Sequence, residues 1–424
     1  MKHIHSVRGM HDMLPDVGKC WFELECILRN IVTKYGYQEI KLPLLEYTEV
    51  FTNAIGESTD IIEKEMYSFL DRSGKSLTLR PEGTAGCVRA GIEYGILHNS
   101  IKRFFYYGPM FRHDRPQKGR YRQLHQFGVE VFGLSGPIID LELILLVRNI
   151  WKIFNIEDKI ELHINTLGNK VVRSKFREKL VQYFEDNLRF LDIDCQRRLK
   201  NNPLRILDSK NPNIKNLIEN APSIIDYLDA KSEKHFFRLC ELLNKLDIKY
   251  KINPTLVRGL DYYNLTVFEW LSKDINNVQN AVCAGGRYDE LVGRMGGKST
   301  PAAGFALGMD RLFNIIKDTI NPPIRNIIYL LHSSETEIIV KIMKIADDIR
   351  NCCKYDVIVH GDEFLNINNH LKKAYKNNAK IVAILDEDTF IQGRILIKCL
   401  SNNSDQYINI TEIVNFVNNY IDVE

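Results

Sequence analysis

The sequence of 424 residues predicts an α+β protein, in which a core with a mixed or antiparallel sheet carries a helical insertion and a C-terminal α/β domain. Three observations predict this organisation. Residues 106–132 have the pattern of a strand, a basic loop and a returning strand, which indicates an antiparallel hairpin. Residues 168–246 are mostly helical in pattern and rich in Lys, Asn, Glu and Leu. After residue 323 strands and helices alternate as βαβαβ, which is typical of a small domain with a largely parallel sheet.

The elements before the insertion follow from local patterns. Apolar residues of 17–35 recur every three or four positions, which predicts a helix that ends at Gly36. The next strand, expected over 38–46, contains Pro43. Because proline cannot donate to a β ladder, this strand is expected at an edge or an interface. The other elements expected in this part are strands at 65–70, 76–80 and 159–167, and helices at 83–95 and 137–154.

Strand patterns return after the insertion. Strands are expected at 265–270, 284–288 and 304–308, with a helix at 309–316, before the linker signal Asn321-Pro322-Pro323. Beyond it we expect strands at 327–331, 356–359, 380–385 and 394–398, and helices at 335–350, 365–376 and 411–421. The core is predicted in two parts, residues 1–167 and 247–322. The insertion between them covers 168–246, and the final domain covers 323–424.

Composition limits the class of protein. The formal net charge is only +3, so bulk charge does not indicate a nucleic-acid binder, and any such surface must be local. The nine cysteines form no C-x-x-C pair, which predicts reduced thiols in a cytosolic protein and no zinc site. The polar N-terminus predicts no signal peptide, and the lack of any run near 18 apolar residues predicts no membrane span.

The hairpin combines both signs of charge on one face. Alternation in its returning strand puts Gln126 and Glu130 on one face and Phe127 on the other, while Arg112 ends the first strand. The loop carries the basic residues Arg115, Lys118, Arg120 and Arg122. A site that holds a triphosphate and an ammonium group needs such a platform. A solvated basic hairpin is the structural alternative.

Two further segments carry candidate binding groups. Glu82 is expected at a helix N-terminus beside Thr84, where a carboxylate is oriented and can bind an ammonium group, although simple capping explains the same pattern. In the segment Leu-Val-Arg-Gly-Leu-Asp-Tyr-Tyr, Arg258 supplies a permanent charge and a planar donor fork suited to phosphate. Tyr262 and Tyr263 supply hydroxyls and flat walls. A structural Arg–Asp pair with core tyrosines is the alternative.

Small residues mark two later segments. Residues 284–289, Ala-Gly-Gly-Arg-Tyr-Asp, indicate a close backbone approach, which alone is weak evidence of a site. The small residues of 302–308 allow a flat ring to lie on the strand, and Arg311 follows at the start of a helix. An arginine stacked on a purine and facing a terminal phosphate fits that position, and tight strand–helix packing is the alternative.

Together these segments resemble class II aminoacyl-tRNA synthetases, and specifically the bacterial histidyl-tRNA synthetases. The helix 17–35 with its following strand resembles motif 1, a dimer-interface element of the class. Residues 112–132 resemble motif 2 and residues 304–312 resemble motif 3. The two segments specific to histidyl enzymes are matched by 256–263 and 284–288, and the family's N-terminal opening by 8–15. The resemblance therefore covers essentially the whole chain.

The resemblance implies a two-step reaction with ATP and L-histidine as substrates and Mg²⁺ accompanying ATP. Histidine attacks the α-phosphorus to give histidyl-adenylate and pyrophosphate, and the terminal adenosine of tRNA(His) then takes the histidyl group. The resemblance also implies a cytoplasmic homodimer and an anticodon-binding domain at 323–424. No metal ligand is identified among the protein side chains.

Roles for particular residues are implied as well. Arg112 and Arg258 would act as catalytic cations on opposite sides of the α-phosphate, and Arg311 would hold the γ-phosphate end. Histidine would be bound by Glu82, Gly83, Thr84, Gln126, Glu130, Arg258, Tyr262 and Tyr263, with Glu130 and Tyr263 on the imidazole nitrogens. ATP would be bound by Arg112, Asp114, Arg120, Phe127 and Arg311, and the tRNA acceptor end by Gln117 and Arg122.

Two positions depart from the family pattern. Asp114 stands where the class commonly has Glu, and Leu385-Asp386-Glu387-Asp388 replaces a stretch in which Gly often follows Leu. Two other functions share the core. One is the catalytically silent regulatory subunit of ATP phosphoribosyltransferase, which usually lacks the C-terminal domain, the intact Arg258 segment and the basic loop. The other is a different class II synthetase, against which Gln126, Glu130 and the Arg258 segment speak.

Overall fold

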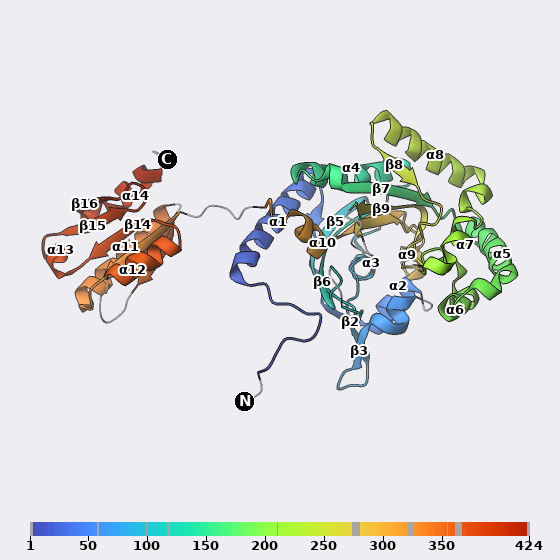
Figure 1. Ribbon diagram of the computed structural model, residues 1–424, viewed down its shortest axis with the longest axis horizontal. Coiled ribbons are helices and arrows are strands. Elements are labelled where there is room, and N and C mark those ends of the chain that lie inside the picture. Colours follow the sequence, from blue (N-terminus) through green and yellow to red (C-terminus); the bar gives the residue numbers. More distant parts are fainter. Residues whose placement is uncertain are drawn as a thin grey trace. The chain divides into compact units, whose positions relative to one another are not determined.

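The computed structural model describes residues 3–56, 59–98, 100–116, 119–209, 211–273, 280–320, 326–353, 355–360 and 367–421. The chain divides into two compact units, Met1–Pro322 and Pro323–Glu424 (Figure 1). The predicted linker Asn321-Pro322-Pro323 lies outside the described residues. Within the described ranges, no helix is both long enough and apolar enough to cross a membrane.

An eight-stranded sheet forms the centre of the first unit, in the order β1-β5-β6-β11-β10-β9-β7-β8. The strands in that order are Gln38–Glu39, Lys102–Phe111, Gln123–Phe132, Ala302–Gly308, Ala281–Arg287, Asn264–Ser272, Ile160–Thr166 and Tyr250–Ile252. The inner pairs are antiparallel, and only the two edge pairs, β1 with β5 and β7 with β8, are parallel. The predicted mixed or antiparallel sheet is therefore confirmed.

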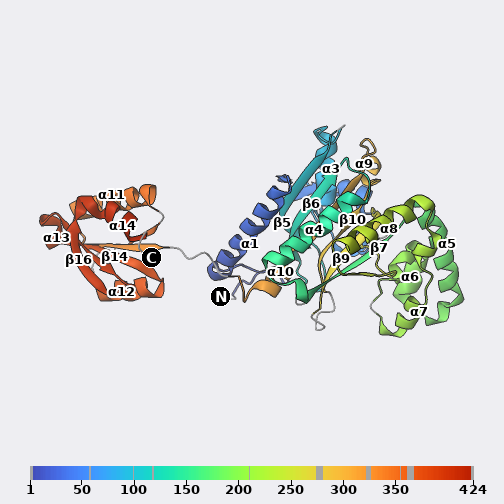
Figure 2. The ribbon, with the colours of Figure 1, turned by 90° about the horizontal axis from the view of Figure 1, so that it is seen from above.

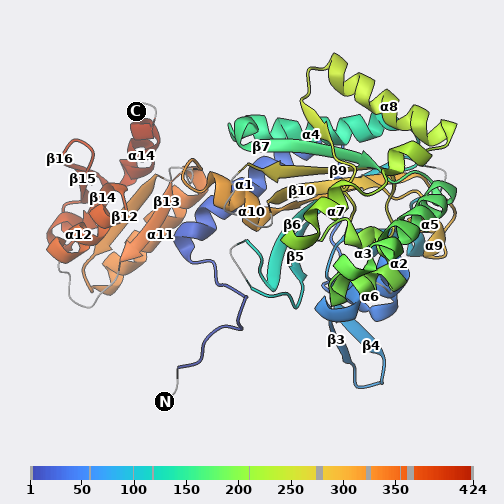
Figure 3. The same cartoon turned by 45° about the vertical axis from the view of Figure 1, so that its right-hand side comes forward.

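Side-chain alternation gives this sheet two buried faces. One face packs beneath four helices (Figure 2), which are α1 (Pro15–Lys34), α4 (Pro137–Ile153), α8 (Ala230–Lys245) and α10 (Met309–Ile316). The other face meets α2 (Thr48–Ile55), α3 (Thr84–Glu93) and the insertion (Figure 3). On β5, Phe105 belongs to the first core and Tyr106 to the second, as a period of two requires.

A second, small sheet has the order β2-β4-β3, with strands Leu45–Tyr47, Ser76–Leu79 and Tyr67–Leu70. The prediction of one continuous strand over 38–46 is wrong, because the chain forms the separate short strands β1 and β2, with Pro43 between them. The carbonyls of Leu42 and Leu44 on either side of Pro43 accept hydrogen bonds from Arg80 instead of from a ladder. Both short strands are edges of their sheets, as the proline predicts.

The insertion is helical, as predicted. Its helices are α5 (Lys170–Asp186), α6 (Ile193–Asn201) and α7 (Lys215–Glu219), joined by 3₁₀ turns that include η4 (Pro203–Ile206) and η5 (Pro212–Ile214). Asn169 and Asp192 cap α5 and α6 through side-chain oxygens that accept backbone N–H groups, which explains where these helices begin. The following helix α8 packs on the main sheet with α4 and belongs to its core.

The second unit has one sheet in the order β13-β12-β14-β15-β16, with strands Asp356–His360, Ile327–His332, Ala379–Leu385, Arg394–Cys399 and Ser404–Asn409. The first three are parallel and the last two antiparallel. Its helices are α11 (Thr336–Cys352), α12 (Ile367–Lys376), α13 (Glu387–Ile391) and α14 (Ile413–Ile421). The predicted α/β domain is confirmed. Strand β16 was not predicted, because its residues are mostly polar and it lies exposed at the edge.

Candidate active site

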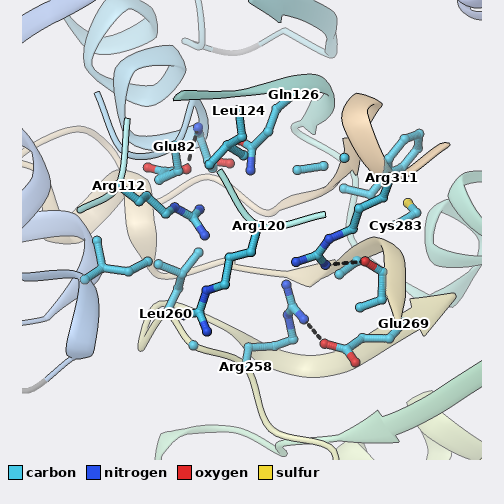
Figure 4. A pocket seen from close by; sticks show the side chains of 18 of the residues that line it. Glu82, Arg112, Arg120, Leu124, Gln126, Arg258, Leu260, Glu269, Cys283 and Arg311 are labelled. Atoms are coloured by element: carbon cyan, nitrogen blue, oxygen red, sulfur yellow. Dashed lines mark hydrogen bonds and ion pairs between the residues drawn. The ribbon is translucent and has the colours of Figure 1, made fainter. Parts of the chain in front are cut away.

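A cavity of about 340 Å³ opens in the first unit (Figure 4). Its walls come from the β5–β6 hairpin, the start of α3, the segment 256–263 and the junction of β11 with α10. These segments are distant in sequence, and the order of the strands brings them together. Among the described residues the arginines that line the cavity are Arg112, Arg120, Arg205, Arg258 and Arg311.

Two of these arginines are fixed by backbone carbonyls. The Nε of Arg112 donates to the carbonyl of Pro81 at 2.8 Å. Arg311 donates to the carbonyls of Gly119, at 3.1 Å, and of Ala281. Burial lowers the pKa of Arg311, and the neighbouring charges of Arg112 and Arg120 lower it further. Positive charge concentrated in this way in a partly buried space favours an anionic ligand.

Arg120 is held by carboxylates. It forms an ion pair with Asp114, and its Nη2 lies 3.4 Å from the Oε1 of Glu65. Asp114 is the position where the class commonly has Glu, and it lines the cavity. Its shorter side chain is engaged by Arg120 and by the backbone N–H of Arg115.

Arg258 lies at the wall of the cavity opposite Glu82 and Gln126 (Figure 4). It forms an ion pair with Glu269, which also lines the cavity, and its guanidinium lies 5.5 Å from the ring centre of Tyr263. Burial is the largest influence on the pKa of Arg258 and acts to lower it, but Glu269, Tyr263 and Tyr262 together outweigh burial, so that the pKa lies above its ordinary value. The Nε of Arg258 is buried and has no hydrogen-bond partner within the described part of the chain.

The start of α3 carries a buried carboxylate. Glu82 accepts the backbone N–H groups of Thr84 at 2.7 Å and of Ala85 at 2.8 Å. Burial raises the pKa of this carboxyl group. Glu82 and Thr84 also line the cavity. Glu82 therefore both accepts backbone N–H groups at the start of α3, as simple capping predicts, and faces the cavity.

Glu130 lies under the cavity wall and is not among the side chains that line it. Its carboxylate accepts hydroxyl groups from Thr84 at 2.7 Å, from Tyr106 at 3.0 Å and from Tyr288. Burial raises the pKa of Glu130 to about 8, and the three hydroxyl groups act in the opposite direction. Three converging donors fix the orientation of this carboxylate.

Tyr106 explains the glycine at position 83. A Cβ at Gly83 or at Gly128 would lie 2.1 Å from the Tyr106 ring, so both positions must lack a side chain. The hydroxyl of that ring reaches Glu130. Tyr262 and Tyr263 line the neighbouring wall, with their ring centres 4.7 Å apart.

Strand β6 places three predicted or neighbouring residues in different surroundings. Gln126 lines the cavity, and its buried Oε1 has no hydrogen-bond partner among the described residues. The prediction that Phe127 contacts ATP is wrong, because its ring lies in the core on the opposite face, stacked on Phe105 with centres 5.4 Å apart. Leu124 lines the cavity instead and was missed, although the alternation that includes Gln126 predicts its face.

The two residues predicted at the tRNA acceptor end lie in the hairpin loop. Gln117 is outside the described residues. Arg122 does not line the cavity. Its Nε donates to the carbonyl of Asp114 at 3.2 Å, and its backbone N–H donates to the carbonyl of Gly9 at 2.7 Å. The loop is therefore tied to the N-terminal segment beside the cavity.

The segment 284–288 divides between a structural and a site-related residue. Arg287 is buried and donates to Asp140 at 2.6 Å and to two backbone carbonyls, so it holds β10 to α4. Tyr288 donates to Glu130. In the described ranges no group of three His, Cys, Asp or Glu side chains is placed to hold a metal ion.

Sequence reasoning missed several residues of the cavity wall. These are Asp60, Glu65, Arg205, Asp208, Glu269, Cys283 and Asp310. Glu269 lies two residues after Val267 on a predicted strand, so alternation predicts that both side chains point to the same face. Alternation does not predict that Glu269 pairs with Arg258. For Arg205, within the insertion, no local pattern indicates that it reaches the cavity.

The fold and site define a class of protein in which an antiparallel sheet carries clustered arginines next to buried carboxylates and tyrosines. The family model for histidyl-tRNA synthetase matches residues 9–312, and the chain belongs to this family. The solved structure of apo S. aureus histidyl-tRNA synthetase is 31% identical, with a TM-score of 0.80, and the match covers 98% of this chain and 100% of that one. The predicted resemblance is thereby confirmed.

Two more distant structures show the fold alone. An ATP phosphoribosyltransferase regulatory subunit/histidyl-tRNA synthetase from Bacillus halodurans is 21% identical, with a TM-score of 0.63, and the match covers 91% of this chain and 99% of that one. Histidyl-tRNA synthetase from Nostoc sp. PCC 7120 is 17% identical, with a TM-score of 0.67, over 99% of this chain and 100% of that one.

Proposed function

We propose that the protein is a histidine–tRNA ligase, which joins histidine to tRNA(His) through a histidyl-adenylate at the expense of ATP. The observation that carries this proposal is the convergence of arginines on one cavity that also holds Glu82, Gln126 and Tyr263. A cationic end suits a triphosphate, and a polar end with oxygen acceptors suits an amino acid with an ammonium group.

At the cationic end, Arg112 and Arg258 both line the cavity, with Arg120 drawn between them (Figure 4), and they would neutralise the α-phosphate from two sides. A carboxylate oxygen of histidine attacks the α-phosphorus, the bond to the β-phosphate breaks, and pyrophosphate leaves. Such a step depends on positioning and on charge stabilisation rather than on proton transfer. Arg311 would hold the γ-phosphate end, and Arg120, with Asp114, would hold the nucleotide.

At the other end, the unpartnered Oε1 of Gln126 and the carboxylate of Glu82 are suited to accept the histidine ammonium. Thr84 and the backbone at Gly83 complete that side. The imidazole would be held by Tyr263 at the cavity wall and by Glu130 from beneath that wall, where the hydroxyls of Thr84, Tyr106 and Tyr288 orient its carboxylate. A ring bound at both nitrogens excludes apolar isosteres, because these would leave buried polar groups unpaired.

Magnesium fits this site as a companion of ATP. The wall carboxylates Glu65, Asp114 and Glu269 each pair with an arginine. The ion would therefore be held chiefly by the β- and γ-phosphates, as Mg²⁺ commonly is in ATP sites, and would neutralise charge on the departing pyrophosphate.

The proposal extends to the partners. The basic hairpin loop, with Gln117 and Arg122, would contact the acceptor end of tRNA(His), and residues 323–424 would bind its anticodon. A homodimer is proposed because the small sheet β2-β4-β3 exposes an apolar face that includes Tyr47 and Phe69. A cytoplasmic location is proposed because the substrates are cytoplasmic and all nine cysteines are free thiols.

Pyrophosphate exchange tests the function directly. The purified chain, incubated with ATP, Mg²⁺ and labelled pyrophosphate, should incorporate label into ATP only when histidine is present, and other amino acids serve as controls. Charging of tRNA(His) should follow. If histidine binds but neither exchange nor charging occurs, the chain is a silent binding protein like the regulatory subunit of ATP phosphoribosyltransferase, and the proposed function is refuted.

A further inference from the structure

The helical insertion contributes an arginine to the cavity. Arg205 lies on the 3₁₀ turn η4 that follows α6, and it lines the same cavity as Arg120 and Arg258. Its side chain is only 12% exposed. Its Nη1 atom is buried and has no hydrogen-bond partner in the described part of the chain, although the carboxylate of Asp208 lies 3.8 Å away. The position of Arg205 links a domain with no other assigned role to the proposed ATP site.

One contact of Arg205 leads towards Arg120. The Nη2 of Arg205 lies 3.4 Å from the Oδ2 of Asp60, which Arg198 also approaches, at 3.3 Å. Asp60 directly precedes a single π-helical turn, η1 (Ile61–Glu65). At the far end of this turn, Glu65 pairs with Arg120, and its carbonyl accepts the backbone N–H of His113 at 2.6 Å.

Other contacts lead towards Arg258. A Cβ at Gly259 would lie 3.5 Å from the Nη1 of Arg205, so the guanidinium packs against the backbone next to Arg258. In the same stretch Asn202 donates to Asp261 at 2.9 Å. The insertion therefore contacts both the segment 256–263, at Gly259 and Asp261, and the start of the turn η1, at Asp60.

We propose that Arg205 is a positioning residue for ATP, which sets the places of Arg120, through Asp60 and η1, and of Arg258, through Gly259. The inference rests on the proposed function for the identity of the ligand. Of the residues expected to hold histidine, Gln126 and Glu130 come from β6, whereas Arg258, Tyr262 and Tyr263 belong to the segment that Arg205 adjoins at Gly259. Because Arg120 is expected to hold only ATP, loss of Arg205 should weaken ATP binding more than histidine binding.

The test compares Arg205→Ala, Arg205→Lys and Asp60→Asn with the wild type and with Arg177→Ala. Arg177 lies on α5 of the same insertion, is exposed and does not line the cavity, so it is the control for loss of an arginine from the insertion. Equilibrium dialysis with labelled ATP gives the dissociation constant, and pyrophosphate exchange gives the KM of ATP and of histidine separately. Thermal unfolding of each variant reports whether the fold is kept.

In Arg205→Ala we expect the ATP dissociation constant and the KM of ATP to rise between about 10-fold and 100-fold, since displaced binding groups have effects of this size. The histidine KM should change less than about threefold, and Arg205→Lys should recover part of the lost ATP affinity. In the double variant Arg205→Ala with Asp60→Asn, the loss of ATP affinity should be smaller than the sum of the two single losses in free energy. ATP binding at the wild-type level, or equal rises in both KM values, refutes the inference. A wild type that binds ATP but shows no exchange refutes the proposed function alone, because dialysis still measures the effect of Arg205.

Discussion

The arginines of the cavity differ in how they are held. Arg112 is fixed by a backbone carbonyl, Arg120 by two carboxylates, and Arg258 by Glu269 under the ring of Tyr263. Each cation is therefore oriented before a ligand arrives. Preorganised charges cost no reorganisation when the transition state forms, which is why this arrangement suits phosphoryl chemistry.

The first prediction concerns Arg258. Arg258→Ala should lower the rate of pyrophosphate exchange by about 100-fold or more, because a preorganised donor beside the α-phosphate is lost. Arg258→Lys should recover little, since one ammonium group cannot both pair with Glu269 and supply a planar fork. Transfer of histidine from preformed histidyl-adenylate to tRNA should fall less.

Glu269→Gln is the comparison for Arg258. It keeps the guanidinium and removes only the carboxylate that pairs with it, so its exchange rate should lie between those of the wild type and Arg258→Ala. If Arg258→Ala exchanges pyrophosphate at the wild-type rate, Arg258 has no role in the formation of histidyl-adenylate.

A second prediction concerns pH and Glu130. Burial raises the pKa of this carboxyl group from its ordinary value of 4.5 to about 8. The folded state then keeps a proton that the unfolded state releases, so folding stability falls as pH rises from about 4.5 to about 8. Relative to Glu130→Gln, the wild type should lose at most about 1.4 kcal/mol per pH unit across that window. Urea unfolding of both proteins at several pH values measures this, and a difference that does not vary with pH contradicts it.

At the scale of elements, the β5–β6 hairpin sorts residues by face. On β6 the even-numbered Leu124 and Gln126 line the cavity, and Glu130 lies just beneath it, while Phe127 and Val129 enter the opposite core. The loop between the strands is tied back through Arg122 to Gly9 and Asp114. Both the strand β6 and the loop, through Arg112, Asp114 and Arg120, thus line the cavity.

A third prediction follows for the loop. Because Arg122 does not line the cavity, Arg122→Ala should keep histidine-dependent pyrophosphate exchange and slow the charging of tRNA. If Arg122 reads the extra guanosine that the family's tRNA carries at its acceptor end, the variant should also narrow the penalty for a tRNA lacking that base. Transfer rates for both tRNAs with both proteins measure this.

Arg115→Ala is the control for Arg122. Arg115 is an exposed arginine of the same loop, and as a phosphate contact it should weaken both tRNAs equally. The same uniform loss in Arg122→Ala would exclude base reading and leave only a phosphate contact.

At the scale of the whole molecule, the small sheet β2-β4-β3 presents an apolar face. Tyr47, Leu77 and Phe69 lie side by side across the three strands, because Leu77 pairs with both of the others. Tyr47 is 51% exposed and Phe69 is 49% exposed. A contiguous apolar surface of this kind usually marks an interface between chains.

The fourth prediction is therefore a homodimer that uses this face. Sedimentation at micromolar concentration should give the mass of two chains, and Phe69→Asp should shift it towards one chain, because a buried unpaired carboxylate destabilises an interface. Val171→Asp, at an exposed apolar position on α5, should remain a dimer. A fully active wild-type monomer would rule out a required dimer.

The periodic elements and the segments that carry the candidate binding groups follow from sequence patterns alone. The three-to-four spacing over 17–35 and the alternation in β6 report which face of an element is buried, because burial repeats with the geometry of the backbone. The same alternation places Gln126 and Phe127 on opposite faces. The wrong prediction that Phe127 binds ATP therefore came from the family resemblance and not from the alternation. Pro43 indicated an edge, although the break between β1 and β2 was not foreseen.

Which charges pair follows from how distant segments pack and not from any sequence pattern. Arg258 with Glu269, Arg120 with Glu65, and Arg205 with Asp60 join residues from different elements, and no local spacing distinguishes these partners from other carboxylates. The same holds for the three hydroxyls around Glu130. The physical reason is that ion pairs and buried hydrogen bonds depend on separations of a few ångströms, which the packing of distant segments sets, whereas periodicity reports only the direction in which each side chain points.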